Sequence, residues 1–129
     1  MSQAVNLHLL SEKARAEIAA GRGTKDDFEK PDFSLLPFDA LGEVARVMEA
    51  GRRKYGASNW RNGMKWSRCA AAALRHIGAW LSGETNDPET GCNHMAHAAC
   101  MALFLVAYSR SHPHLDDRYV KPVANDDGA

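Results

Sequence analysis

The 129-residue sequence has little of what builds a disulfide framework, a membrane anchor or a β-sheet. Its cysteines, Cys69, Cys92 and Cys100, are odd in number and lack C-x-x-C spacing, which argues against disulfides and against a structural zinc knuckle. No apolar run approaches the ~20 residues that span a bilayer, and the first residues lack the regions of a signal peptide. Alternating Val, Ile, Thr or Tyr segments are nearly absent. We therefore expect a cytoplasmic, all-α protein.

The sequence also lacks an excess of charge of one sign, because 16 basic residues balance 16 acidic ones. A neutral chain has no overall field to recruit nucleic acid or an anionic membrane, so we expect neither as a stable partner. The length suits one domain. We expect its core over about residues 30–110, after an N-terminal helix and loop over 1–29 and before a polar tail over 113–129.

Apolar periodicity predicts a bundle of about four helices. The predicted ends are Ser11 and Gly21 for the first helix, residues 37–39 and Gly56 for the second, Ser67 and Gly83 for the third, and Asn93 and residue 111 for the fourth. The predicted apolar faces are Leu41, Val44, Ala45 and Met48 on the second helix, and Ala70, Ala73, Leu74, Ile77 and Leu81 on the third. The fourth helix is the most hydrophobic and is expected at the centre of the core. The alanines at 70–73 would let helices approach closely, within a subunit or between subunits of an oligomer.

The stretch between the last two helices carries the first candidate chemistry. Glu84, Asp87 and Glu89 precede His94 and His97, which lie three residues apart and share a helix face. Carboxylates suit Mg²⁺ or Mn²⁺, while histidine favours Mn²⁺, Fe²⁺, Co²⁺ or Zn²⁺. The alternative is a solvated acidic loop beside a core or capping histidine.

Cationic and aromatic residues on the neighbouring segments suit a nucleotide. Lys54 and Arg75 are candidate phosphate contacts, and Trp60 beside Asn59 can stack on a base. Lys54 lies eleven residues after Glu43, which puts both on one face if the helix stays regular. The alternatives are a solvated charged face, a surface ion pair, and a tryptophan that lies over the core.

These pieces stand in one order: "EKPDFSLLPFDAL", "GRRKYGASNW", "RHIGAWLSGETNDPETG" and "HMAHAA". In that order, over roughly Lys30 to Leu105, the sequence resembles the phage and bacterial dATP/dGTP diphosphohydrolase family, a relative of the MazG-like all-α nucleoside triphosphate pyrophosphohydrolases. The resemblance implies an oligomeric helical bundle that uses Mg²⁺ or Mn²⁺. It implies hydrolysis of a deoxypurine triphosphate to the monophosphate and pyrophosphate, in the host cytoplasm if a phage encodes the protein.

The resemblance also implies roles for individual residues. Metal ligands are expected at Glu43, Glu84, Asp87, Glu89 and His94, and catalytic groups at Glu43, His94 and His97. Substrate contacts are expected at Lys54, Tyr55, Asn59, Trp60, Arg75 and His76.

Two positions depart from the related patterns. Arg46 stands three residues after Glu43, where the wider superfamily has the second acid of an E-x-x-E pair, and Met101 stands where a polar Asn is expected. These departures leave a non-catalytic nucleotide-binding protein, such as a phage nucleotide sponge, as an alternative function. A structural helical oligomer that binds no nucleotide is a further one.

Overall fold

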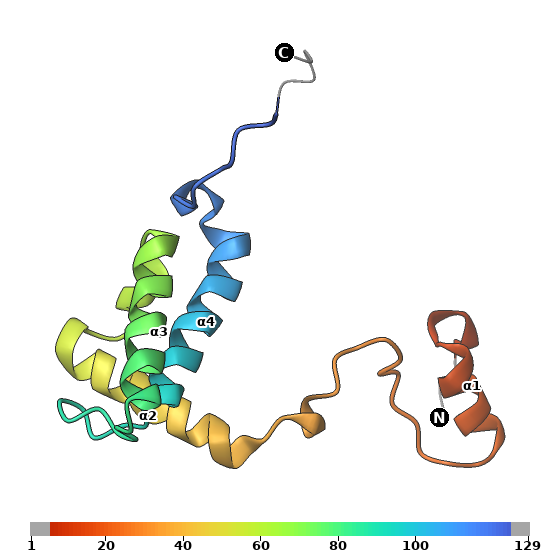
Figure 1. Ribbon diagram of the computed structural model, residues 1–129. Helices are drawn as coiled ribbons and strands as arrows, with labels where there is room; N and C mark the ends of the chain where they lie inside the picture. The colour runs from red at the N-terminus through yellow and green to blue at the C-terminus, as the bar shows by residue number, and fades with distance from the viewer. Residues whose placement is uncertain (1–5, 125–129) are drawn as a thin grey trace. The chain divides into compact units, whose positions relative to one another are not determined.

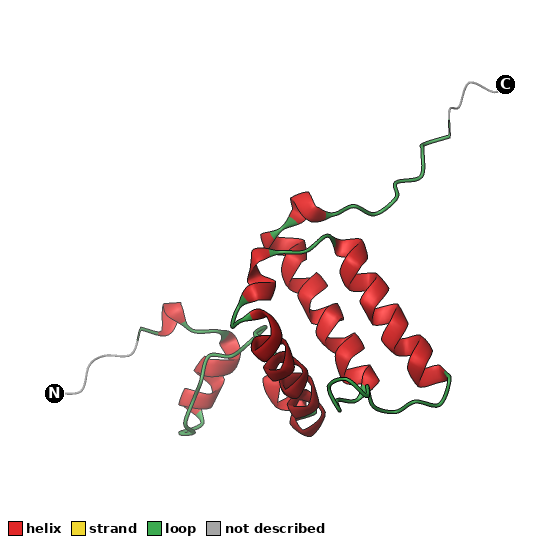
Figure 2. Cartoon of the chain, turned by 90° about the vertical axis from the view of Figure 1, so that its left-hand side faces the viewer, coloured by secondary structure: helices red, strands yellow, loops and turns green. Residues whose placement is uncertain are grey.

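The computed structural model describes residues 6–124, and this part of the chain is helical with connecting loops (Figure 2). Its α-helices are α1 (Glu12–Ala19), α2 (Phe38–Tyr55), α3 (Trp66–Leu81) and α4 (His94–Ser111). Short 3₁₀ turns are η1 (Leu7–Leu9), η2 (Phe33–Leu35), η3 (Asn59–Asn62) and η4 (Pro113–Leu115). Residues 6–124 contain no strand beyond an isolated bridge between Asn86 and Asn93. The prediction of an all-α fold with about four helices is confirmed.

The chain divides into two compact units, Met1–Leu36 and Pro37–Ala129. In the first unit, the Ser11 hydroxyl accepts a hydrogen bond from the Ala14 N–H and so caps α1, as the sequence predicts. The Asp26 carboxylate accepts the Ser11 N–H at 3.0 Å and holds the following loop against this cap. The candidate functional residues all belong to the second unit.

Helix α2 ends where the sequence predicts, because Gly56 adopts a φ of +89° that other residues disfavour. Its buried face differs from the predicted stripe. Val44 and Val47 are buried, whereas Met48 is 39% exposed. Of the extensive contacts between helices, α2 takes part only in the one with α4. A narrow i, i+3 stripe of buried residues is enough to cover that contact.

Helices α3 and α4 form an antiparallel pair, and they make the most extensive helix–helix contact in the described chain (Figure 1). Helix α4 contacts both α2 and α3, so it carries most of the core, as predicted. The core cluster consists of Val44, Val47, Cys69, Cys92, Ala96, Cys100, Phe104 and Tyr108. Even so, neither α4 nor any other helix within residues 6–124 is long and apolar enough to cross a membrane.

Two predictions for α3 are wrong. Ser67 does not cap the helix, which begins at Trp66; its N–H and hydroxyl instead donate to the Asp117 carboxylate of the tail. Leu74 and Leu81 belong to the predicted apolar face, but they are 67% and 73% exposed and do not pack in the core. Only one side of α3 faces α4, and Cys69, 1% exposed, lies on that side.

The turn after α2 approaches the 3₁₀ turn after α4 closely at Gly63. This glycine has a φ of +93°, and a Cβ placed on it would lie 2.6 Å from the His112 ring and 2.7 Å from the Leu115 side chain. The Trp66 indole N–H also donates to the His112 carbonyl at 3.2 Å. The turn before α3 and the segment after α4 are therefore in direct contact. This contact lies at the end of the α3–α4 pair away from the loop that connects the two helices.

Candidate functional site

Residues 82–93, here called the acidic loop, connect α3 to α4 and fold back on themselves. The Asp87 N–H donates to the Cys92 carbonyl at 2.8 Å, and the Gly91 N–H donates to the Asp87 carbonyl at 2.7 Å. Gly91 supplies a left-handed φ of +73°, which lets the chain reverse. The loop is therefore a hydrogen-bonded turn and holds its side chains in a fixed direction.

Asp87 is the most enclosed carboxylate of the acidic loop, with a side chain only 16% exposed. Its Oδ1 accepts the Glu89 N–H at 2.8 Å, an Asx turn that fixes the side-chain rotamer. Its Oδ2 lies 3.6 Å from Nε2 of His97. The hydrogen bond to Oδ1 therefore positions Oδ2 toward the histidines.

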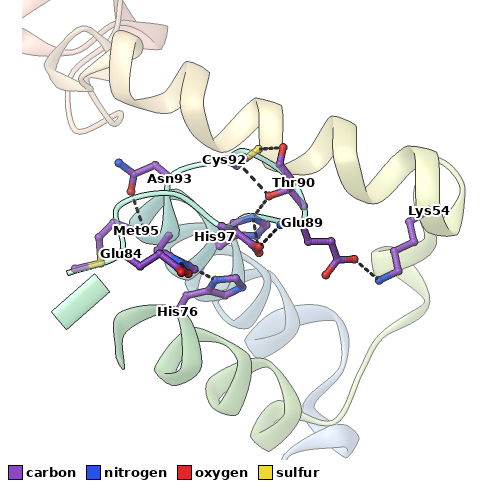
Figure 3. A network of polar contacts seen from close by, with 11 residues as sticks. Lys54, His76, Glu84, Glu89, Thr90, Cys92, Asn93, Met95 and His97 are labelled. Carbon is purple, nitrogen blue, oxygen red and sulfur yellow. Dashed lines mark hydrogen bonds and ion pairs between the residues drawn. The ribbon is translucent and has the colours of Figure 1, made fainter. Parts of the chain in front are cut away.

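Three histidines meet beside Asp87, and Figure 3 shows two of them, His76 and His97. His94 and His97 come from the first turn of α4, where Asn93 caps the helix by accepting the Met95 N–H. His76 comes from the last part of α3, and its ring stacks on His97 with centroids 4.2 Å apart and planes within 5°. The Nδ1 atoms of His76 and His94 lie 2.9 Å apart.

Glu84 joins the cluster through His94. Its Oε1 lies 2.6 Å from Nε2 of His94, whose side chain is 5% exposed, while the Glu84 side chain is 52% exposed. A carboxylate at this distance accepts the ring N–H. The contact therefore fixes which nitrogen of His94 carries its proton.

Thr90 is a member of the site that the sequence reasoning missed. Its hydroxyl oxygen lies 2.7 Å from Nε2 of His97 and accepts the Cys92 N–H at 3.2 Å. Nothing in the string "PETG" distinguishes this threonine from a solvated loop residue. The contact depends on how the loop folds back over α4.

Burial is the main influence on two of the imidazoles. It lowers the pKa of His76, and the neighbouring His97 lowers that pKa further. Burial also lowers the pKa of His97, against the opposing effect of the Asp87 charge. Both rings are therefore favoured in the neutral form, in which one nitrogen has a free lone pair.

The donor atoms of His76, Asp87 and His94 all lie within 4.8 Å of one another. Neutral imidazole nitrogens with one carboxylate oxygen are an ordinary ligand set for a divalent metal, with further positions left for water or substrate. The chemistry and spacing of these donors fit a metal ion. His76, expected from the sequence as a substrate contact, is part of this group.

Two other predicted residues contact each other on the rim of the site. The Lys54 ammonium lies 3.1 Å from Oε1 of Glu89, with side chains 58% and 70% exposed (Figure 3). Tyr55 follows on α2, and the same ammonium lies 5.3 Å from the centroid of its ring. The structure thus joins an expected phosphate contact to an expected metal ligand.

The remaining predicted residues lie outside the histidine cluster. Glu43, Asn59 and Arg75 are exposed, and within residues 6–124 none makes a side-chain hydrogen bond or ion pair. Trp60 is half-buried and stacks on Phe104, with centroids 4.6 Å apart and planes within 4°. This packing is that of a tryptophan lying over the core, and the expected contact of Trp60 with substrate stays a prediction.

The chain matches known proteins over most of its length. Residues 20–118 match the family described as "dATP/dGTP diphosphohydrolase, N-terminal". Over 96 residues, 74% of the chain, it is 38% identical to a dATP/dGTP diphosphohydrolase of Salmonella phage PMBT28. It spans about a third of the length of that curated relative, 33%. No solved structure matches the chain.

Proposed function

The chain belongs to the dATP/dGTP diphosphohydrolase family, and we propose that it hydrolyses dATP or dGTP to the deoxynucleoside monophosphate and pyrophosphate with a divalent metal. The observation that carries the proposal is the meeting of His76, Asp87 and His94 in a chain of this family. A water molecule attacks the α-phosphorus, the bond from that phosphorus to the β-bridging oxygen breaks, and pyrophosphate leaves. Such a reaction needs charge neutralisation of the triphosphate and a group that takes the proton of the water.

The histidine–aspartate cluster supplies the residues for these two needs. Asp87 and His94 would hold the metal, which when bound neutralises phosphate charge. His97 is the proposed proton acceptor, because it is buried, its pKa is lowered, and Asp87 lies 3.6 Å away to stabilise the protonated ring. The Thr90 hydroxyl orients its ring.

The rim supplies cations for the triphosphate. The Lys54 ammonium is exposed, and its one ion pair within residues 6–124 is with the exposed Glu89, so phosphate oxygens can replace that partner at small cost. Arg75 precedes His76 on α3 and is exposed, and its charge contributes to the lowered pKa of that histidine. Both cations are therefore proposed to bind the β- and γ-phosphates, with Tyr55 and Asn59 on the side of the sugar and base.

The test is product analysis with each deoxynucleoside triphosphate in the presence of Mg²⁺ or Mn²⁺. We expect stoichiometric monophosphate and pyrophosphate from dATP or dGTP, and loss of turnover with EDTA. No turnover of any of the four substrates with either metal would refute the proposal. Nucleotide binding that survives EDTA without hydrolysis would identify a nucleotide-sequestering protein instead.

Met101, one of the two departures from the related patterns, has a structural role. Its side chain is half-buried and packs against the core cluster. An apolar residue is suited to that position, so its presence is no argument against catalysis. Arg46, the other departure, is exposed on α2.

We also propose that the active form is a homo-oligomer formed through α3 and α4. Leu74 and Leu81 lie seven residues apart on α3, and Leu103 and Val106 lie three apart on α4; these side chains are 67%, 73%, 49% and 66% exposed. Exposed alanine and glycine positions, Ala71 and Gly78, continue the same α3 stripe at helical spacing. Such stripes suit a second copy of the same helix pair.

Light scattering after size-exclusion chromatography tests the oligomer. The wild type should elute as a multiple of the 14.1 kDa chain, and Leu81→Glu should shift the equilibrium toward monomer. Arg46→Glu, a change at an exposed position on α2 and outside the α3–α4 pair, is the control. A wild type that is monomeric at high micromolar concentration would refute this assembly.

The setting proposed for the reaction is the cytoplasm, where deoxynucleoside triphosphates are used.

A further inference from the structure

We infer that the metal of this centre is bound by ring nitrogens of both His76 and His94 with the Asp87 carboxylate, while Glu84 stays outside and orients His94. The inference rests on the proposed function for the role of the metal. It differs from the sequence-based ligand set because His76 becomes a ligand, Glu84 becomes a positioning residue, and Glu43 and Glu89 are no longer ligands. It also predicts that Mn²⁺, Fe²⁺, Co²⁺ or Zn²⁺ binds in preference to Mg²⁺.

The contact between Glu84 and His94 decides which nitrogen of His94 is free. An ionised carboxylate only accepts, so at 2.6 Å the proton must lie on Nε2 of the ring. Neutral His94 then has its lone pair on Nδ1. That atom faces away from Glu84 and toward His76, at 2.9 Å.

The second Nδ1 atom is placed to share a metal with the first. Two nitrogens bound to one ion at the usual Zn–N distance of about 2.0–2.1 Å lie roughly 3 Å apart, close to the observed spacing. Without metal, His76 donates the Nδ1 proton across this gap. With metal, His76 carries its proton on Nε2 and presents the Nδ1 lone pair.

The third donor is Asp87, and its neighbour Glu89 is excluded by its own contacts. The Asp87 carboxylate supplies an oxygen to the group within 4.8 Å, and the Glu89 N–H that its Oδ1 accepts holds the side chain in place. The Glu89 side chain turns outward and pairs with Lys54 (Figure 3). Its carboxylate is 70% exposed at the rim and is not among the donor atoms that gather within 4.8 Å.

Two imidazoles with one carboxylate set the preference for the metal. Mg²⁺ is hard and favours oxygen ligands, whereas imidazole suits first-row transition ions. A carboxylate that accepts the second ring N–H of a metal-bound histidine holds the ring in place and makes it a stronger donor. Glu84 is in that position relative to His94, and its own side chain is half exposed.

Titration with Co²⁺ tests the ligand set independently of catalysis, because bound Co²⁺ absorbs visible light and its bands report on the ligands. The protein should be the full chain without a histidine tag. The wild type is expected to bind one Co²⁺, with bands that a large excess of Mg²⁺ does not remove. His76→Gln and Asp87→Asn should abolish these bands, with circular dichroism to confirm that the helices remain.

Glu84→Gln leaves the ligands in place but removes the carboxylate from His94. We expect about 10–100-fold weaker Co²⁺ affinity, in line with the loss of such outer partners in other metal sites. The thermal stability of the metal-free protein should be unchanged, since Glu84 is half exposed. Glu89→Gln and His114→Asn are controls that should bind Co²⁺ as the wild type does.

The outcomes separate this inference from the proposed function. Undiminished Co²⁺ binding by folded His76→Gln, or displacement of Co²⁺ by equimolar Mg²⁺, would overturn the ligand set, even if dGTP is hydrolysed. If His76→Gln does not keep its helices, His76→Asn is used instead. The competition between Mg²⁺ and Co²⁺ for the wild type still tests the ligand set. Tight Co²⁺ binding lost in the variants, without hydrolysis of any nucleotide, would support the ligand set and refute the enzyme.

Discussion

The two ends of α4 bury different kinds of side chain. The first turn buries His94 and His97 beside carboxylates, while the last turns bury Phe104 and Tyr108 against Trp60. Burying imidazoles costs free energy unless every polar atom has a partner, whereas burying aromatic rings is favourable. The aromatic end therefore stabilises the fold. The histidine end lowers that stability but forms the candidate site.

Truncation of Phe104 should be the most damaging change at the aromatic end. The ring is 8% exposed and stacks on Trp60, so Phe104→Ala should lower the free energy of unfolding by about 3–5 kcal/mol. Urea denaturation followed by circular dichroism measures it. Phe104→Leu, which keeps most of the buried volume, is the control and should lose much less. Equal stability of the alanine variant and the wild type would contradict this view of the core.

Asp87→Asn tests the other end. It keeps the side-chain shape and the turn, since the amide oxygen can still accept the Glu89 N–H, but removes the charge facing the histidines. We expect at least ~100-fold slower pyrophosphate release, about 2.7 kcal/mol in the barrier, with thermal stability almost unchanged. Loss of folding in parallel with activity would mean that the two ends of α4 are not separate in function.

Tyr108→Phe is a smaller probe of the aromatic end. The Tyr108 hydroxyl is buried and donates to the Trp60 carbonyl, and burial raises its pKa to about 12. Loss of the hydroxyl leaves that carbonyl without this donor, for an expected cost of about 1–2 kcal/mol in unfolding free energy. Activity should be unchanged, as measured by pyrophosphate release. A variant as stable as the wild type would show that water replaces the hydroxyl.

The raised pKa of Tyr108 also predicts a dependence on pH. The unfolded chain loses the phenol proton near pH 10, while the native state keeps it until about pH 12. Between these values the native state binds more protons, so stability falls as pH rises. Denaturant melts of the wild type and Tyr108→Phe should therefore converge from pH 10 to 12. Parallel curves would contradict the prediction.

The smallest expected effect on stability is at the rim. Lys54→Met breaks an exposed ion pair with Glu89 and should change the unfolding free energy by less than about 0.5 kcal/mol. If Lys54 binds phosphate, the same change should raise KM for the nucleotide several-fold. Lys65→Met, an exposed lysine just before α3, is the control and should leave KM unchanged.

Features set by local sequence could be predicted, and features set by tertiary partners could not. The Ser11 cap, the Gly56 stop and the Asn93 start depend on nearby backbone geometry, and the structure has all three. Ser67 resembles a cap in sequence, but a tail residue fifty positions away, Asp117, takes its hydrogen bonds. Local pattern cannot reveal such a partner.

The same distinction applies to the candidate site. The acidic loop and the two histidines of α4 are neighbours in sequence, so their proximity could be expected. His76 reaches them only because α3 and α4 are antiparallel, which brings a residue eighteen positions away against His94. Helical periodicity also misplaced Leu74 and Leu81, because it marks apolar positions without showing which of them a neighbouring helix covers.

Gly63 has a consequence for how this sequence can vary. Any side chain at position 63 would clash with His112 and Leu115. The residue that carries it would also have to adopt the left-handed backbone conformation of Gly63. The turn before α3 and the segment after α4 therefore share one constraint. In a library of all single substitutions selected for folded protein, position 63 should tolerate almost nothing. Second-site revertants of Gly63→Ala should arise at 112 or 115, which would make this glycine a genetic link between two segments of the chain.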